Sequence, residues 1–186
     1  MNKLQVLFII LTIYLVYVQS HKQKQVDQQQ LKNYVSFILY NLYFLKIYEQ
    51  HNFFREWHQV EPLEIDQEIE QYAKNYSDYL ATNKNSKIVL SNGTYGENIM
   101  RSTPKVVEKF GAYYWYNEIK RFNFSNPKLY GGVSHFTQMV WKDSKKIGCG
   151  ISQRRGNVFT VCNYSPRGNI RDELEDNVFP KKEESK

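Results

Sequence analysis

The sequence has 186 residues and a formal net charge of +6 at pH 7. This length accommodates one domain with a sizeable core and excludes a second full domain. Basic residues are interleaved with acidic ones along the chain, which argues against nucleic-acid binding and only weakly favours anionic lipid headgroups or cell-wall polymers.

Residues 1–20 are typical of a secretory signal peptide. Lys3 precedes an almost wholly apolar run from Leu4 to Val18, and Val18-Gln19-Ser20 offers a cleavage site before the polar His21. An uncleaved membrane anchor is the alternative, although 15 apolar residues fall short of the roughly 20 that a spanning helix needs. We therefore expect a secreted, extracellular protein.

Secretion would also expose glycosylation sequons to modification. Three of them are plausible acceptors, at Asn75, Asn92 and Asn123. A fourth, at Asn163, adjoins Cys162 in an expected strand and is followed by Pro166, so we do not expect it to be modified.

Residues 21–49 read as an N-terminal extension with an apolar helix. Tyr34 to Ile47 is mostly aromatic and aliphatic, which favours a buried helix, with a membrane-contacting or partner-contacting surface as the alternatives. The helix should continue through His58 and end at Glu61-Pro62, because proline pushes the preceding residue out of helical geometry.

Two further helices are expected before residue 123. Asp66 starts one helix, whose apolar stripe predicts an amphipathic element laid on the domain: Ile69, Tyr72, Ala73, Tyr76 and Leu80. Thr103 and Pro104 fit the start of another that runs to about Phe122. Glu118 lies on an apolar stripe of that helix, so its carboxylate needs a partner.

The segment from residue 134 to 169 carries the strongest signals. Ser134 is expected to cap a short helical turn bearing His135, and residues 146–153 and 158–164 alternate as two half-buried strands. With residues 154–157 as the loop, the residue numbers of each pair of opposed strand positions sum to 311, which places Cys149 opposite Cys162. These are the only two cysteines, so we predict a disulfide, which stabilises the fold by about 3 kcal/mol in the chain-entropy model.

Three helices and one hairpin predict an α+β domain. The motifs HFTQMVWKDSKKIGCG and VFTVCNYSPRGN resemble the C-terminal signatures of the CAP superfamily of cysteine-rich secretory, antigen 5 and pathogenesis-related-1 proteins, in its single-domain, glioma-pathogenesis-related form. HNFFREWH, GENI and WYNEI, upstream, extend the resemblance. It implies an α-β-α sandwich with a small, mainly antiparallel central sheet over residues 50–180, followed by a charged tail at 181–186.

The resemblance also implies a central cleft holding two histidines and two glutamates. Glu97, Glu118 and His135 match three of these positions, and the fourth, counted back from Glu97, falls on Ser86. No histidine lies between His58 and His135, so the second imidazole is missing. We expect no cofactor, and metal binding at His135 that is weak or absent. A core histidine hydrogen-bonded to Glu118 or Glu97 is the favoured role for His135, ahead of that of a metal ligand.

We therefore expect a non-catalytic protein whose cleft binds a lipid such as a sterol or fatty acid, or a cell-surface or cell-wall partner. A defence-type or signalling effector acting by protein binding is the alternative. A metal-dependent hydrolase is less favoured, because both cysteines are committed to the disulfide and the metal-ligand set is short by one.

Overall fold

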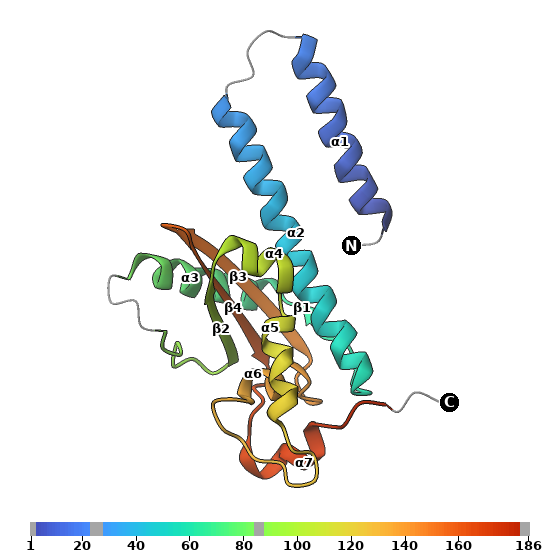
Figure 1. Ribbon diagram of the computed structural model, residues 1–186, viewed down its shortest axis with the longest axis vertical. Helices are drawn as coiled ribbons and strands as arrows, with labels where there is room; N and C mark the ends of the chain where they lie inside the picture. Colours follow the sequence, from blue (N-terminus) through green and yellow to red (C-terminus); the bar gives the residue numbers. More distant parts are fainter. Residues whose placement is uncertain (1–2, 23–27, 84–87, 183–186) are drawn as a thin grey trace. The chain divides into compact units, whose positions relative to one another are not determined.

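The computed structural model describes residues 3–22, 28–83 and 88–182. It divides into an N-terminal unit, Met1–Leu45, and a C-terminal unit, Lys46–Lys186. The N-terminal unit contains helix α1 (Lys3–Lys22) and the first part of helix α2 (Gln28–Trp57), as Figure 1 shows. Among the described helices, none combines the length and apolar character that a membrane span requires.

The first half of α2 is not the buried helix that its composition suggested. Large apolar side chains there are exposed, Phe37 at 66% and Tyr34 at 58% among them. Burial begins only near the end of the stretch, where Ile47 and Tyr48 enter the core of the C-terminal unit. The apolar composition therefore reflects a core position only in the last turns of the segment.

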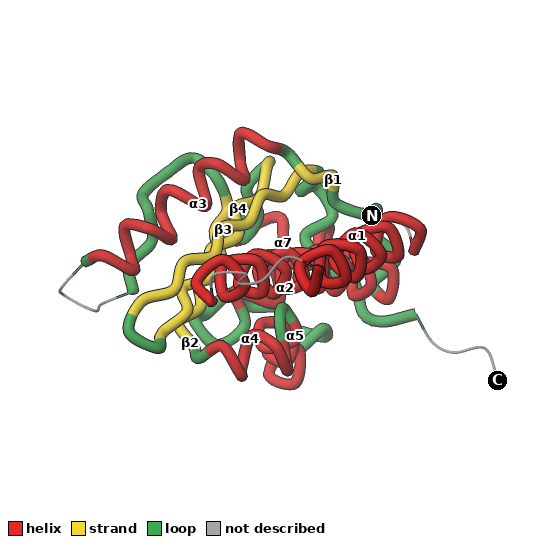
Figure 2. The backbone as a smooth tube through the Cα atoms, turned by 90° about the horizontal axis from the view of Figure 1, so that it is seen from above, coloured by secondary structure: helices red, strands yellow, loops and turns green. Residues whose placement is uncertain are grey.

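A four-stranded sheet lies at the centre of the C-terminal unit. Its strands are β1 (Glu64–Ile65), β2 (Gly96–Ser102), β3 (Lys146–Arg154) and β4 (Asn157–Ser165), in the order β1-β3-β4-β2. Only β1 pairs in parallel, with β3. Helix α3 (Gln67–Thr82) covers one face, and α4 (Pro104–Phe110) and α5 (Tyr113–Tyr116) lie on the other (Figure 2). The α+β fold with a mainly antiparallel sheet is thus confirmed.

The hairpin has the register that its sequence predicts. Cys149 pairs with Cys162 across β3 and β4, their Cα atoms are 4.1 Å apart, and their sulfur atoms form a disulfide. The strands extend one residue further at the turn than expected, to Arg154 and from Asn157. Arg155 and Gly156, at the tip, both have positive φ angles of 48° and 77°. Two such residues form the tight turn that matches the twist of a hairpin.

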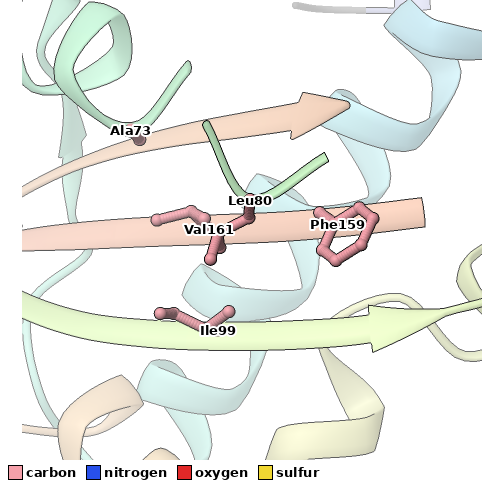
Figure 3. Packing of buried hydrophobic residues seen from close by; sticks show 5 residues of the cluster. All are labelled: Ala73, Leu80, Ile99, Phe159 and Val161. Atoms are coloured by element: carbon pink, nitrogen blue, oxygen red, sulfur yellow. The ribbon is translucent and has the colours of Figure 1, made fainter. Parts of the chain in front are cut away.

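Helix α3 packs very closely on the sheet. The Asp66 side chain accepts hydrogen bonds from the backbone N–H groups of Glu68 and Ile69, which caps the helix start as expected. Gly148 of β3 lies under the helix, where a Cβ atom would come within 2.1 Å of backbone. The core cluster between helix and sheet, drawn in Figure 3, comprises Ala73, Leu80, Ile99, Phe159 and Val161.

The single helix expected from Thr103 to Phe122 is broken. It forms α4 (Pro104–Phe110), α5 (Tyr113–Tyr116) and the 3-10 helix η1 (Asn117–Arg121). Gly111 ends α4 with a φ of 54°, and the Gln50 side chain accepts a hydrogen bond from the N–H of Ala112 at 2.8 Å. The chain turns here because glycine adopts this conformation without strain and Gln50 satisfies the freed donor.

The last elements close the C-terminal unit: α6 (Ser134–Met139), η2 (Arg171–Glu173) and α7 (Leu174–Asn177). The Arg55 guanidinium, fully buried, donates to the carbonyl oxygens of Glu61, Met139, Trp141 and Ser144. Burial lowers the pKa of Arg55 to about 10, so the group remains charged at neutral pH. One side chain of α2 thereby fixes both the chain after α2 and the chain after α6.

Candidate functional site

Glu118 and His135 form a tight pair. Nδ1 of His135 lies 2.8 Å from Oε1 of Glu118, and the other carboxylate oxygen accepts hydrogen bonds from the backbone N–H groups of His135 and Phe136. Arg121 approaches the same carboxylate at 3.8 Å. The glutamate on the apolar stripe has therefore found its partner on α6.

These contacts replace the cap that the sequence suggested. Ser134 is the first residue of α6, and the N-cap position is Val133, which makes no side-chain cap hydrogen bond. The Glu118 carboxylate, which reaches over from η1, accepts from the free N–H groups instead. Burial by itself would raise the pKa of Glu118, but the hydrogen bonds from the His135 ring and from these N–H groups lower it below its usual value.

The outer nitrogen of His135 is the chemically available atom of the pair. Because Nδ1 donates to Glu118, Nε2 is the nitrogen left to accept a proton or a ligand, and it has no hydrogen-bond partner within the described residues. The side chain is 32% exposed, and the Trp115 ring lies nearly parallel to it at 6.1 Å between centroids. The arrangement presents one oriented imidazole to solvent.

Glu97 belongs to a different hydrogen-bond group. Its Oε1 accepts from the backbone N–H of Ser91 at 2.8 Å, and its Oε2 accepts from the amide of Asn163 at 3.1 Å. This carboxylate therefore ties the chain before β2 to the sheet. Within the described residues it shares no hydrogen bond or ion pair with Glu118 or His135.

The pleat of β2 explains this separation. Successive residues of a strand point to opposite faces, so Glu97 shares its face with Ile99, which packs against α3. Asn98 faces the other way and donates to the carbonyl oxygen of His135 at 3.0 Å and to Tyr164 Oη at 3.1 Å. The neighbouring residue, rather than Glu97, connects β2 to the histidine turn.

A zinc ion of the kind that the family resemblance implies does not fit the donors present. The position of the missing histidine, Ser86, lies outside the described residues. Within the described part of the chain, no group of three or more histidine, cysteine, aspartate or glutamate side chains is arranged to hold a metal. The carboxylate oxygens of Glu118 and Glu97 already accept hydrogen bonds from N–H groups. His135 therefore offers a single nitrogen as a metal ligand, whereas such zinc sites use at least three protein ligands.

A cavity of about 380 Å³ opens beside Glu97. Three stretches far apart in the sequence form its wall: residues 90–93 with 95–97, Gln138 of α6, and residues 167–169. Arg167 is the basic residue of the lining, and Leu90 and Tyr95 are its large apolar residues. Neither Glu118 nor His135 belongs to this lining.

Gln138 and Asn169 position the cavity wall and were not singled out from the sequence. Oε1 of Gln138 accepts from the N–H of Gly168 at 3.0 Å, and Nε2 donates to Ser144 Oγ at 3.1 Å. Asn169 accepts from Thr137 at 2.6 Å and donates to the carbonyl oxygen of Ser134. These residues belong to the HFTQMVW and NYSPRGN motifs, so the motifs themselves were the available signal.

A buried histidine supports the site from α2. Nδ1 of His51 lies 2.7 Å from the carbonyl oxygen of Ile47 and therefore donates to it, which leaves Nε2 to accept from Tyr164 Oη at 2.7 Å. Burial lowers the pKa of His51 to about 4. A neutral His51 thus orients Tyr164, which in turn receives the amide of Asn98.

The predicted glycan acceptors differ from the excluded one in accessibility. Asn75 on α3, Asn92 at the cavity and Asn123 after η1 are all exposed. Asn163 is fully buried in β4, and its amide donates to Glu97.

Comparison with known proteins gives a consistent result. The model of the cysteine-rich secretory protein family, CAP, matches residues 48–164. Golgi-associated plant pathogenesis-related protein 1 of Homo sapiens is 38% identical over 142 residues, which cover 74% of this chain and 92% of that protein. Pathogenesis-related protein 1 of Arabidopsis thaliana is 32% identical over 120 residues, covering 64% and 73% of the two chains.

Solved structures agree on the architecture. The crystal structure of NaASP2 with Zn²⁺ superposes with a TM-score of 0.56 at 26% identity, covering 75% of this chain and 85% of that one. Schistosoma mansoni venom allergen-like protein 4 gives a TM-score of 0.52 at 21% identity, covering 78% and 94%. The second likeness concerns the fold alone.

Proposed function

The chain belongs to the cysteine-rich secretory protein (CAP) family, and from this premise we propose that it is a secreted, non-catalytic protein that binds a cell-surface or cell-wall partner through the cavity beside Glu97. The observation that carries the proposal is the lining of that cavity of about 380 Å³, which includes one acidic residue, Glu97, and one basic residue, Arg167. A polar segment of a partner would meet residues of both charges in this lining.

The composition of the lining favours such a partner over a sterol or fatty acid. Pockets that take small apolar ligands are lined mainly by hydrophobic and aromatic side chains. Here Leu90 and Tyr95 stand among glycines and polar groups, and the large aromatic side chains of Trp115 and Trp141 are buried in the core. A lipid ligand is therefore the second candidate, and the experiment below tests it directly.

The absence of a catalytic step is also part of the proposal. Both cysteines are in the disulfide, and within the described residues no serine or threonine hydroxyl is hydrogen-bonded to Nε2 of His135. The Glu118 carboxylate is engaged at the start of α6, which supports a positioning role rather than proton transfer. NaASP2 is described with Zn²⁺, but the donor set of this chain falls short of a zinc site, so no step here depends on a metal.

Secretion and glycosylation complete the proposal. The apolar segment at residues 4–18 supports cleavage near Ser20, and exposure of Asn75, Asn92 and Asn123 supports their modification. The human relative carries a Golgi association in its name, which makes retention in that compartment the alternative. Expression in eukaryotic cells tests secretion and glycosylation. The intact mass of the secreted protein should correspond to a chain that starts at His21, and it should fall after glycosidase treatment. Unprocessed protein retained in the cells would contradict the proposal.

The cavity is tested with variants of its acidic and its basic lining residue. Fluorescently labelled protein is titrated onto intact cells and onto insoluble peptidoglycan, with Glu97→Gln and Arg167→Gln compared to the exposed controls Glu175→Gln and Arg171→Gln. We expect each cavity variant to weaken saturable binding at least tenfold, consistent with loss of a charged hydrogen bond of about 1.5–3 kcal/mol. The controls should bind as the parent does.

Lipid binding is measured on the same proteins. Native mass spectrometry reports co-purified lipid, and labelled sterol and fatty acid are titrated directly. If the protein binds lipid saturably and Glu97→Gln or Arg167→Gln abolishes this binding, the occupant of the cavity is a lipid rather than a cell-surface or cell-wall partner. Cell-surface binding that neither variant changes would remove the cavity from the function.

A further inference from the structure

Three consecutive aliphatic side chains are exposed just before the cavity. Ile88 is 43%, Val89 53% and Leu90 62% exposed. Single apolar side chains on a surface need no explanation, but contiguous ones mark interaction sites. Tyr79 of α3, 52% exposed, extends this apolar strip. We call these four residues the apolar strip.

The strip is held against α3 with its side chains turned outward. Tyr76 Oη donates to the carbonyl oxygen of Val89 at 2.7 Å, and Tyr72 Oη donates to Ser91 Oγ at 3.2 Å. The rings of Tyr76 and Tyr79 are stacked at 5.6 Å between centroids. Because α3 binds the backbone of Val89 and the side chain of Ser91 just after the strip, the exposed aliphatic groups are presented on an ordered support.

Arginine side chains gather at the C-terminal end of α3, the helix that carries Tyr79. Arg154 donates to the carbonyl oxygen of Thr82 at 3.3 Å, which places the hairpin tip against the C-terminus of α3. Arg155 follows at the turn, and Arg101 of β2 donates to Asn157 in the same tip at 3.1 Å. In Figure 1 the tip of β3 and β4 lies on the same side of the sheet as this end of α3. We call Arg101, Arg154 and Arg155 the basic end.

No acidic residue interrupts the segments that meet there. The sequence contains no aspartate or glutamate from Tyr79 to Ser91, from Ile99 to Val107, or from Ser144 to Arg171. Asp78 of α3 is occupied by Lys74 and Ser152, each at 2.5 Å. The basic end therefore carries an excess of positive charge at the end of α3 that bears Tyr79.

We propose that this part of the C-terminal unit docks on a lipid bilayer with anionic headgroups. The aliphatic side chains of the apolar strip enter the headgroup region, and the guanidinium groups of the basic end bind headgroup phosphate and carboxylate. A polyanionic polysaccharide would match the arginines but leave the aliphatic groups in water. A bilayer surface satisfies both, because it offers anionic groups directly above apolar chains.

The test measures binding of the purified secreted protein to vesicles. Phosphatidylcholine vesicles with and without 20 mol% phosphatidylserine are sedimented with the protein at about 0.05 M and 0.5 M salt, a range over which screening of exposed charges changes strongly. We expect binding only to the anionic vesicles, with weakening at high salt. Ile88→Ser combined with Val89→Ser should lower the partition coefficient at least tenfold. Arg154→Gln combined with Arg155→Gln should lower it roughly tenfold or more at low salt.

The matched control is Ile170→Ser combined with Arg171→Gln, an exposed apolar and basic pair elsewhere in the chain that should leave binding unchanged. Leu90 is kept, because it also lines the cavity. Loss of binding in the arginine variant alone would indicate a polyanion surface and overturn the bilayer assignment. Binding unchanged in both variants, or a dimer dissolved by Ile88→Ser, would also overturn it. Thermal melts confirm that every variant is folded.

Discussion

At the scale of single residues, Glu118 links the family signature to the stability of α6. Glu118→Gln keeps the shape of the side chain but can no longer accept from three N–H groups. We expect a loss of about 1–3 kcal/mol in the free energy of unfolding, since buried donors lose their acceptor. Urea denaturation measures it, with the exposed Glu175→Gln as the control. A variant as stable as the parent would show that the carboxylate is not needed as a cap.

His51 makes a prediction about pH. Its pKa is about 4 in the folded protein, where the ring is neutral, and near 6.5 when unfolded. As pH falls, His51 is protonated in the unfolded chain before it is protonated in the folded protein. The stability that depends on a neutral His51 is therefore complete above pH 6.5 and is lost as pH drops toward 4. At pH 5 the loss amounts to about 2 kcal/mol.

Denaturation curves at pH 7 and pH 5 for the parent and for His51→Gln isolate this term. The substituted protein should be less stable at pH 7 but should lose about 2 kcal/mol less on acidification. Because the lowered pKa of Glu118 also costs stability on acidification, only the difference between the two proteins is assigned to His51. Equal pH dependence in both proteins would contradict the burial of a neutral ring.

At the scale of elements, the contact of α3 with the sheet depends on glycines in β3. A Cβ atom on Gly150 would lie 2.3–2.4 Å from backbone atoms of Ala73 and Lys74, so helix and strand would have to separate. We expect Gly150→Ala to cost at least about 3 kcal/mol, as overpacking against backbone cannot be relieved by a rotamer change. Gly131→Ala, with open space around it, is the control and should be near neutral.

The elements that were predicted well are those specified by several signals close together in the sequence, such as a cap, an apolar period or a turn. Asp66 and the apolar stripe of α3 gave the helix and its cap, and the alternation around Arg155-Gly156 gave the hairpin and the Cys149–Cys162 pairing. The two-residue strand β1 exists only through pairing with β3, which no local pattern records. Likewise, the break at Gly111 depends on Gln50, distant in the sequence.

The same distinction explains the site. Motif matching identified the Glu118–His135 pair, because both residues lie within signature segments. It could not show that the pleat turns Glu97 toward α3, since one residue of register decides the face. The cavity lay beyond reach of pattern analysis, because Gln138 and Arg167 become its neighbours only when the chain after β4 folds back.

At the scale of the whole molecule, the disulfide is the one covalent tie between strands. Replacing both Cys149 and Cys162 by alanine should lower the free energy of unfolding by about 3 kcal/mol, because the unfolded chain regains the freedom of the short loop. The measurement is the urea midpoint with and without reductant. Reductant should destabilise the parent alone, and an equal effect on the variant would contradict this origin.

The chain after β4 is anchored step by step along the domain. Gly168 is held by Gln138, and the backbone of Lys142 donates to Asn177 at 3.1 Å. Further on, Phe179 accepts from His58 and Lys182 donates to the carbonyl oxygen of Trp57. A proteolytic nick just past Pro166 would spare the sheet and its disulfide, and these hydrogen bonds would keep the cut segment in place. A clipped molecule would thus keep residues 167–169 in the wall of the cavity, and partner binding should survive limited digestion at this bond.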